Sequence, residues 1–336
     1  MTKYRLSRIV GLLCIALATA GCSKDIAPSF SDDGDMKAGD PVMFTTHMSG
    51  KATTRGAYDG WRSAEGYTFT YFMYKKVESV STFVAKGSTV YWPDINTNAY
   101  GFKAMTGTLK EGVTDGAFAE LAAVQSTEAS LINEDQLLGF GAASNDIITA
   151  LNYRTGTAWK SANYNDGITG ENQKKIRLYM QHQRAKITII LKAGVGVLRS
   201  DLTYPASGVS VKIYSYKGAT PTTTEITPYA SSANIDYTAS DYGGAAASVA
   251  TTKYQAIVNP YDYRTGEGKN IAQITVGGRT FTYKPSNDTS GTGDYDLTAG
   301  KHLTITITLS PGAAMSASVT NWTESSTDAT LEPDSN

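Results

Sequence analysis

The residues of this chain that could carry out chemistry are few and lie far apart. His47, His182 and His302 each stand in or beside a predicted strand, without a nearby cysteine or second histidine to complete a metal site. The carboxylates of Asn133-Glu134-Asp135 and of Glu324 have no partner at a spacing that indicates paired acid–base catalysis. The sequence contains no nucleophile elbow, phosphate loop or dinucleotide fingerprint. We therefore predict that the protein is not an enzyme and takes no metal or cofactor.

The composition favours a protein built from sheets. The chain has 336 residues, with 30 Lys and Arg against 31 Asp and Glu, and its formal net charge is −1. This balance argues against a nucleic-acid binder, which must neutralise phosphates. Only 18% of the residues are charged and 41% are apolar. Thr, Ser, Asn and Gln must therefore supply much of the polar surface, as is typical of sheets and turns.

The N-terminal segment resembles a bacterial lipoprotein signal. Lys3, Arg5 and Arg8 form a positive region, an apolar run covers Ile9–Ala20, and small residues then lead into Cys22. The run is too short to span a bilayer as a helix, which needs about 20 residues. The resemblance implies cleavage before Cys22 and a lipid on that cysteine that attaches the chain to a membrane. An ordinary secretory signal with an incidental cysteine is the alternative.

The rest of the chain divides into a tether and two domains. Residues 22–40 contain five aspartates and read as a solvated acidic tether. The length predicts two domains rather than one. We assign residues 41–183 to an N-terminal domain and residues 184–336 to a C-terminal domain with its tail, after a signal peptide at 1–21. Each half then has an ordinary domain size.

Alternating apolar residues predict a strand at the start of the first domain. In Pro41–Met48, the side chains of Val42, Phe44 and Met48 share one face. Within Ala117–Gln125, apolar residues at positions i, i+3 and i+4 predict one short helix. The first half is therefore expected to be mostly strand.

The second half has a clearer strand pattern. In His302–Leu309, three apolar residues alternate with three threonines, which indicates an antiparallel sheet with one buried and one solvated face. Gly277-Gly278 predicts a two-residue hairpin turn, because glycine adopts positive φ without steric cost. Further strands are predicted at Lys186–Lys192 and Val209–Tyr216. Many strands with glycine-rich turns predict a β-sandwich.

Six short segments occur in an order that is similar to one known family. They are Tyr91-Trp92-Pro93, Tyr100-Gly101-Phe102-Lys103-Ala104, Gln181–Ile187, Ala256-Ile257-Val258-Asn259-Pro260, Leu297-Thr298-Ala299-Gly300-Lys301 and Asn321-Trp322. Together they run from about residue 91 to residue 322. They resemble the fimbrillin-like lipoproteins of Bacteroidetes, which are subunits of type V fimbriae. The tyrosine after Asn259-Pro260 departs from the family pattern.

This resemblance implies a fold, a location and a set of partners. The fold is all-β, with two tandem transthyretin-like antiparallel β-sandwich domains. The location is the outer membrane or cell surface, where a fimbria (pilus) serves adhesion. The partners are other fimbrial subunits, joined head to tail as a homo- or hetero-polymer, and an Arg-specific surface protease. That protease would cut between Arg55 and Gly56, in a polar, glycine-flanked stretch.

The implied cleavage has a physical consequence for the first strand. Removal of the strand that carries Val42, Phe44 and Met48 would open an apolar groove bordered by unpaired backbone groups. A neighbour's extended segment could then fill the groove by donor-strand exchange. Such a contact is heterologous, so it builds an open filament unless it closes into a ring.

The donor segment is left open by the sequence. Met315, Ala317 and Val319 alternate and form one candidate, whereas the tail Thr323–Asn336 has only two apolar residues and is a poor donor. A chain that does not donate would be a basal anchor or a tip subunit.

A different class of function remains open. A surface lipoprotein could bind glycans or host protein through a patch of exposed tryptophans, for which Trp61, Trp92 and Trp159 are the candidates. Core or sheet-face packing is the more ordinary role for each of these side chains.

Overall fold

We describe a computed structural model of the chain. It covers residues 38–42, 44–48, 67–77, 80–94, 98–114, 116–141, 176–241, 246–264, 269–288, 294–310 and 316–321.

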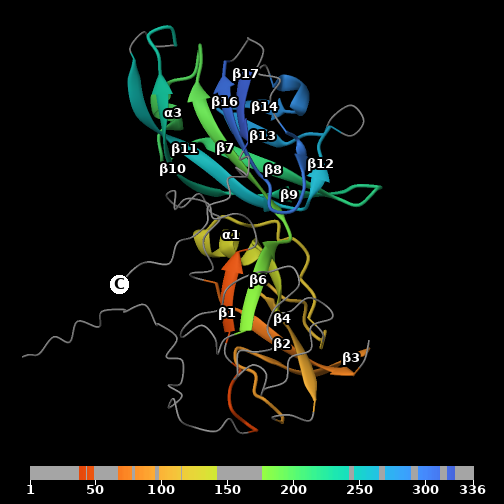
Figure 1. Ribbon diagram of the computed structural model, residues 1–336. Coiled ribbons are helices and arrows are strands. Elements are labelled where there is room, and N and C mark those ends of the chain that lie inside the picture. Colours follow the sequence, from red (N-terminus) through yellow and green to blue (C-terminus); the bar gives the residue numbers. More distant parts are fainter. Residues whose placement is uncertain are drawn as a thin grey trace, which may run out of the picture. The chain divides into compact units, whose positions relative to one another are not determined.

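Six strands of the N-terminal half form one sheet, with the order β1-β6-β5-β4-β2-β3 (Figure 1). All neighbours in it are antiparallel except β1 and β6, which run parallel. One core, which includes Leu178, Met180 and Trp92, lies against this sheet. The strands are β1 (Phe44–Met48), β2 (Thr70–Val77), β3 (Val80–Gly87), β4 (Ala99–Met105), β5 (Leu137–Gly141) and β6 (Ile176–His182).

The prediction of a helix within Ala117–Gln125 is wrong. That segment is extended: Phe118 bridges to Leu109, and Val124 pairs in parallel with Thr227. The apolar spacing was misleading because Gln125 does not make helical hydrogen bonds. Its N–H donates to the Thr227 carbonyl, and its side-chain amide donates to the Ile257 carbonyl.

A helix does form immediately afterwards, at α1 (Glu128–Glu134). The Ser130 N–H donates to the Thr127 hydroxyl, and the Thr127 N–H donates to the Ser130 hydroxyl. This reciprocal cap satisfies two N–H groups that would otherwise lack partners at the helix start.

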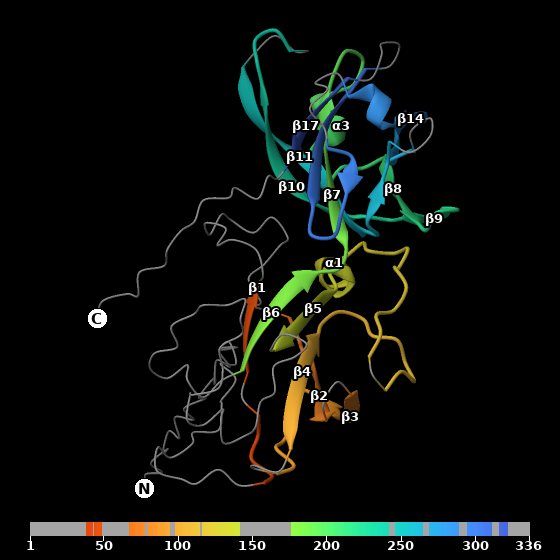
Figure 2. The same cartoon turned by 45° about the vertical axis from the view of Figure 1, so that its right-hand side comes forward.

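The C-terminal half is a sandwich of two sheets around a shared core (Figure 2). One sheet has the order β10-β11-β7-β16-β17, the other β14-β13-β8-β9, and β12 and β15 form a ribbon. Two short helical turns, α3 (Arg199–Leu202) and η2 (Pro285–Asn287), lie between strands. The strands are β7 (Ala185–Ala193), β8 (Val209–Lys217), β9 (Thr222–Ile226), β10 (Tyr229–Tyr237), β11 (Ala247–Val258), β12 (Tyr261–Asp262), β13 (Ala272–Val276), β14 (Arg279–Tyr283), β15 (Asp296–Leu297), β16 (His302–Leu309) and β17 (Ser316–Asn321).

Strand β16 has the predicted bounds and the predicted faces. Ile305, Ile307 and Leu309 are fully buried, and the intervening threonines are half-buried. Its sheet is mixed rather than antiparallel throughout, because β16 pairs in parallel with β7 and antiparallel with β17. Alternation fixes which residues share a face, but it does not fix the direction of the neighbouring strand.

The predicted hairpin is also confirmed. Strands β13 and β14 pair from Ala272↔Tyr283 to Val276↔Arg279. Gly277 and Gly278 join them with φ angles of 55° and 74°, as a two-residue turn with both central residues at positive φ requires. The all-β prediction is therefore confirmed, whereas the tandem transthyretin-like description and the domain boundaries stay predictions.

Buried tyrosines are common in both halves. Burial raises the pKa of Tyr216, Tyr254 and Tyr283 to about 12. The pKa of Tyr100 is also raised to about 12, by burial and then by its hydrogen bond to Asp94. The folded protein thus holds these phenols neutral at a pH where exposed tyrosines ionise.

We expect the stability to fall as the pH rises from 10 to 12. Unfolded tyrosines ionise near 10.0 and these folded ones near 12, so their contribution is complete below pH 10 and is lost as pH approaches 12. Tyrosinate absorbance and far-ultraviolet circular dichroism should be followed through one alkaline titration. The late tyrosinate signal should appear together with the loss of the sheet signal. Ionisation of all the tyrosines near pH 10 while the sheets remain intact would contradict this assignment.

Candidate assembly site at the first strand

Residues 39–48, which we call the first segment, pair with two separate parts of the N-terminal half. The Val42 N–H donates to the Val90 carbonyl at 2.8 Å, and the Trp92 N–H donates to the Asp40 carbonyl at 2.9 Å. From Phe44 onward the segment instead pairs in parallel with β6 (Figure 1). Strands β6 and β3 belong to opposite sides of the sheet, and Val90 follows β3. The first segment therefore pairs with two parts of the chain that are far apart in sequence, β6 and the stretch that follows β3.

Two side chains of the first segment, Val42 and Phe44, pack in or against the core. Val42 is only 4% exposed and belongs to the same core cluster as Val90 and Trp92. The ring of Phe44 stacks on Tyr71 of β2, with centroids 4.3 Å apart and planes 5° apart. The edge of Phe102 of β4 meets the same ring, at 5.4 Å between centroids. Phe44 thus rests on two strands that are not its hydrogen-bonded neighbours.

The second half of the segment runs beside buried residues of β6. The register places Thr46 opposite Leu178 and Met48 opposite Met180. Leu178 and Met180 are fully buried in the core. The edge of β6 that receives the first segment is therefore apolar on its inner face.

The candidate donor lies partly within the described residues. Ala317 and Val319 belong to β17, where they pair with Ile307 and Ile305 of β16. Because β17 ends the five-stranded sheet, one of its sides is bonded to β16 and the other is an edge. This candidate donor already forms a strand within its own sandwich.

Several predicted site residues fall outside the residues that the structure describes. They are Cys22, Arg55, Gly56, Trp61, Trp159 and Met315.

Trp92 does not belong to an exposed aromatic patch. It is fully buried and meets Tyr100 and Phe102 edge to face. The expectation that Trp92 could stack on a sugar is therefore wrong, and its packing role is the one the structure supports.

His302 has the surroundings of a packed core residue rather than those of a metal ligand. His302 is buried, and its Nε2 lies 2.8 Å from the Thr188 hydroxyl. Burial, together with Lys186 and Lys253, lowers the pKa of His302 well below its ordinary value. Over the described ranges, no group of three or more His, Cys, Asp or Glu side chains is placed to hold a metal ion.

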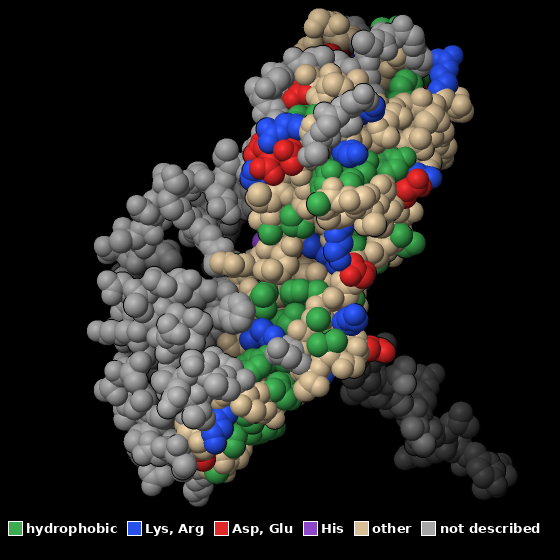
Figure 3. Space-filling view, turned by 90° about the vertical axis from the view of Figure 1, so that its right-hand side faces the viewer, with side chains coloured by type: hydrophobic (Ala, Val, Ile, Leu, Met, Phe, Trp, Pro, Cys, Tyr) green, Lys and Arg blue, Asp and Glu red, His purple; other side chains and the backbone are tan. Residues whose placement is uncertain are grey.

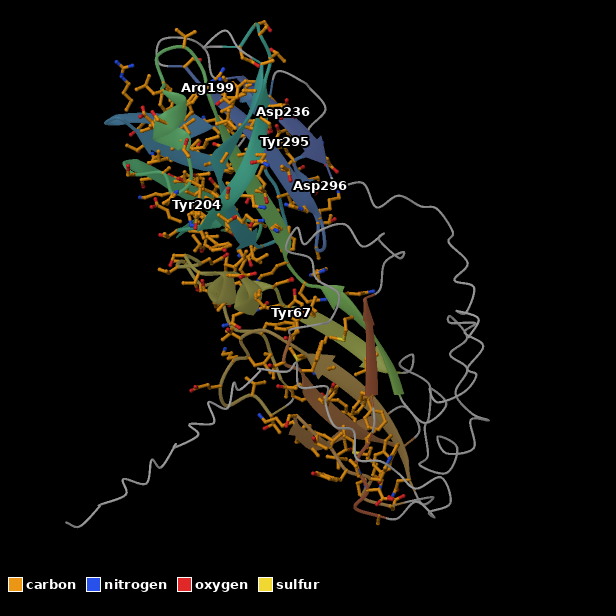
Figure 4. The ribbon with its side chains drawn as sticks, turned by 90° about the vertical axis from the view of Figure 1, so that its left-hand side faces the viewer. Tyr67, Arg199, Tyr204, Asp236, Tyr295 and Asp296 are labelled. Carbon is orange, nitrogen blue, oxygen red and sulfur yellow. The ribbon has the colours of Figure 1, made fainter. Side chains whose placement is uncertain are left out.

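A buried polar cluster, which the sequence did not reveal, lies between α1 and the end of β6. His182 Nδ1 lies 2.6 Å from Asp135 Oδ1. The hydroxyl of Tyr67, which Figure 4 labels, donates to Asp135 Oδ2 at 2.5 Å. The Arg184 guanidinium forms an ion pair with the Glu134 carboxylate, and both side chains are nearly inaccessible to solvent. We call these five residues the junction cluster.

The two segments that supply most of the junction cluster were noted in the sequence, but nothing there indicated that they contact each other. The carboxylates of Asn133-Glu134-Asp135 had no identifiable partner, and Gln181–Ile187 was noted only as a family-like segment. The pairs are about 50 residues apart, as for Glu134 and Arg184. No local periodicity relates residues at that separation, so only the folded structure shows the pairing.

Gln125 forms a second connection from the loop before α1. It is fully buried; its Nε2 donates to the Ile257 carbonyl at 2.9 Å, and the Ile257 N–H donates to its Oε1 at 2.8 Å. The amide thus satisfies both polar backbone groups of one residue at the end of β11. Together with the junction cluster, it ties this loop and α1 to the strands that follow residue 183, within one compact unit from Met36 to Asn336.

The surface charges are mixed in sign. On the face in Figure 3, basic and acidic side chains lie in small neighbouring groups. Exposed pairs include Lys212 with Glu225 and Lys217 with Glu120. Such pairs contribute little to stability, about 0–1 kcal/mol each. Within the described residues, no helix is long and apolar enough to cross a membrane.

The sheets, the first segment and the buried polar contacts define an all-β protein. The model of the fimbrillin-like family matches residues 30–322, so the chain belongs to the fimbrillin-like family. This membership supports the general function of an adhesion-related fimbrial subunit at the cell surface. The family is of a structural rather than an enzymatic type.

Solved structures that match this chain include several from Bacteroides species. A candidate cell adhesion protein from Bacteroides uniformis is 17% identical, with a TM-score of 0.40, and the match covers 84% of this chain and 98% of that one. One from Bacteroides ovatus is 12% identical, with a TM-score of 0.43 and coverages of 85% and 96%. A fimbrial protein from Bacteroides ovatus is 12% identical, with a TM-score of 0.33 and coverages of 81% and 49%. No protein of curated function matches the chain. The family model, which spans both halves, carries the assignment.

Proposed function

We propose that the chain is a structural subunit of a type V fimbria that assembles when a neighbour's strand replaces its first segment. The observation that supports this proposal is the position of the first segment: it pairs with both β6 and the stretch after β3, and it places Val42 in the core and Phe44 against it. A strand in this position can be exchanged only for another strand that forms comparable contacts.

The contacts of the first segment set the free energy that a replacing strand must recover. Each buried apolar side chain such as Val42 contributes about 1.5–3 kcal/mol, and each backbone hydrogen bond a net of about 0.5–1.5 kcal/mol. Two side chains and several hydrogen bonds therefore amount to about 5–10 kcal/mol before ordering costs. This is a large part of a typical domain stability of about 5–15 kcal/mol.

Processing belongs to the same proposal. A lipid on Cys22 would hold the chain at the outer membrane, and a surface protease would cut between Arg55 and Gly56. The cut would fall between β1, which ends at Met48, and β2, which begins at Thr70. It would therefore sever the covalent link of the first segment and leave noncovalent contacts to hold it. A neighbour's strand would then replace the first segment if it bound in this position more tightly than the first segment does.

The position of the subunit in the fimbria depends on β17. In a stalk subunit, the strand with Ala317 and Val319 would leave β16 and enter the neighbour. In a basal anchor or a tip subunit, it would stay paired as the structure shows it. We propose the stalk role, because an edge strand leaves a sheet by breaking the hydrogen bonds of one side alone.

Cleavage at Arg55 should produce polymers. Protein sheared from cells that make the other fimbrial subunits is expected to begin at Gly56 and to run as a ladder of detergent-resistant species in unboiled samples. Arg55→Ala should abolish both the new N-terminus and the ladder, whereas Lys51→Ala, which removes a neighbouring basic residue, should change neither. Surface material that contains only full-length lipidated monomer would count against the stalk role.

A further inference from the structure

We infer that the strand which replaces the first segment is selected by an aromatic socket, and that it carries an aromatic residue two positions after a β-branched one. The socket consists of Tyr71 and Phe102, which contact Phe44, together with Phe69, which lies beside Tyr71. The inference rests on the proposed function and names the chemistry of the partner strand. The occupant is a segment of a different fimbrial subunit.

The socket belongs to parts of the chain that stay in place when the first segment leaves. Tyr71 is on β2 and Phe102 is on β4, and the rings of Phe69 and Tyr71 are 6.3 Å apart. In the structure, the ring of Phe44 occupies the socket, where it stacks on Tyr71 and meets Phe102 edge to face. Aromatic pairs in such geometries are more favourable than their buried area alone accounts for. An aliphatic side chain would fill this space without recovering the ring contacts.

The neighbouring position requires a smaller side chain. Val42 is buried beside Val90 and Trp92 in one cluster. Trp92 is fully buried and is held edge to face by Tyr100 and Phe102. Close-packed surroundings of this kind cannot widen without a cost in stability. A β-branched residue also suits the extended backbone at this point.

The spacing of the two positions is fixed by hydrogen bonds on both sides. Residues 39–42 bond to the stretch after β3, and residues 44–48 bond to β6. A replacing strand must meet both partners, so it needs about ten residues in the same register. Its β-branched and aromatic side chains must then be two residues apart, because side chains on one face of a strand repeat every second residue.

The C-terminal candidates of this chain fit the socket poorly. Alignment of Val319 with the Val42 position places Asn321 in the socket. Alignment of Thr320 and Trp322 supplies the aromatic ring but places Glu324 at the Thr46 position, opposite the buried Leu178. A carboxylate loses hydration where it packs against an apolar side chain such as Leu178. A different subunit with an uncharged residue after its aromatic one is therefore the better occupant than a second copy of this chain.

A peptide-exchange experiment tests the inference on the full chain. A recognition sequence for a specific protease is inserted within residues 50–60, and cleavage leaves the first segment held without a covalent link. Fluorescent ten-residue peptides are then added, and their binding is measured by anisotropy and native mass spectrometry. The reference peptide has the sequence of residues 39–48.

The expected order of binding follows from the socket. The Phe44→Ala peptide should bind about 10–100-fold more weakly than the reference, and the Phe44→Leu peptide about 3–10-fold more weakly. Phe44→Tyr and the control Thr45→Ala should stay close to the reference. In a Tyr71→Ala protein, the difference between the reference and the Phe44→Leu peptide should shrink, which a merely structural effect of that substitution would not produce.

Each adverse result has a separate meaning. Equal binding of the reference and the Phe44→Ala peptide overturns the socket while leaving strand exchange in place. A peptide of residues 317–326 that binds as tightly as the reference overturns the choice of a different subunit. If not even the reference peptide exchanges into the cleaved protein, the proposed function itself fails.

Discussion

Replacement of Arg184 by alanine is expected to lower the free energy of unfolding by about 3–5 kcal/mol. The guanidinium is buried and pairs with the Glu134 carboxylate, and it also donates to the carbonyls of Glu134 and Ala119. Burial lowers the pKa of Arg184, and the Glu134 carboxylate opposes that shift. Removal of the cation would leave a buried carboxylate and two carbonyls without this donor.

Urea denaturation of the full chain measures this loss. The matched control is Lys217→Ala, because the pair of Lys217 with Glu120 is exposed and should change the stability by less than about 1 kcal/mol. Arg184→Lys keeps the charge but loses the planar fork, so an intermediate loss is expected. If Arg184→Ala proved no more destabilising than the control, the junction cluster would not hold this region together.

Replacement of Trp92 by alanine should cost a similar amount, about 3–5 kcal/mol. The indole is fully buried and packs edge to face with Tyr100 and Phe102. Its removal would leave a large cavity in the core that Val42 shares. The first segment should therefore be displaced more easily in this variant than in the native protein.

The neighbouring residue provides the control for Trp92. Tyr91 is 54% exposed, so Tyr91→Ala should alter the stability by no more than about 0.5 kcal/mol. Thermal and urea unfolding of the two variants would show the contrast. Comparable stability of both, together with a loss of glycan binding in Trp92→Ala alone, would revive the tryptophan patch that the structure argues against.

The parts of the fold that could be predicted are those determined by residues close together in the sequence. The alternation in His302–Leu309 gave the bounds and faces of β16, and Gly277-Gly278 gave the hairpin turn. The same alternation could not give the parallel partner of β16, because β7 lies more than a hundred residues earlier in the chain. Strand neighbours depend on the packing of the whole sandwich, which local periodicity does not contain.

In the candidate site too, local features could be predicted from the sequence, whereas contacts between distant segments could not. The apolar face of Pro41–Met48 was visible in the sequence, but the rings that surround Phe44 were not, since β2 and β4 are brought to it by the fold. The false helix within Ala117–Gln125 has a related cause. Its apolar spacing suited a helix, yet the bonds of Gln125 to Ile257 hold it extended. Tertiary contacts override weak local preference in such cases.

The parallel pairing of β1 with β6 has a mechanical consequence. Strand β6 ends at His182, and β7 begins at Ala185, so tension on a strand seated beside β6 would pass almost directly into β7 and the sandwich of the C-terminal half. Two parallel strands pulled apart along their length load their hydrogen bonds in shear, all at once rather than one by one. A fibre connected in this way would resist traction more strongly than one whose strands could unzip from an end.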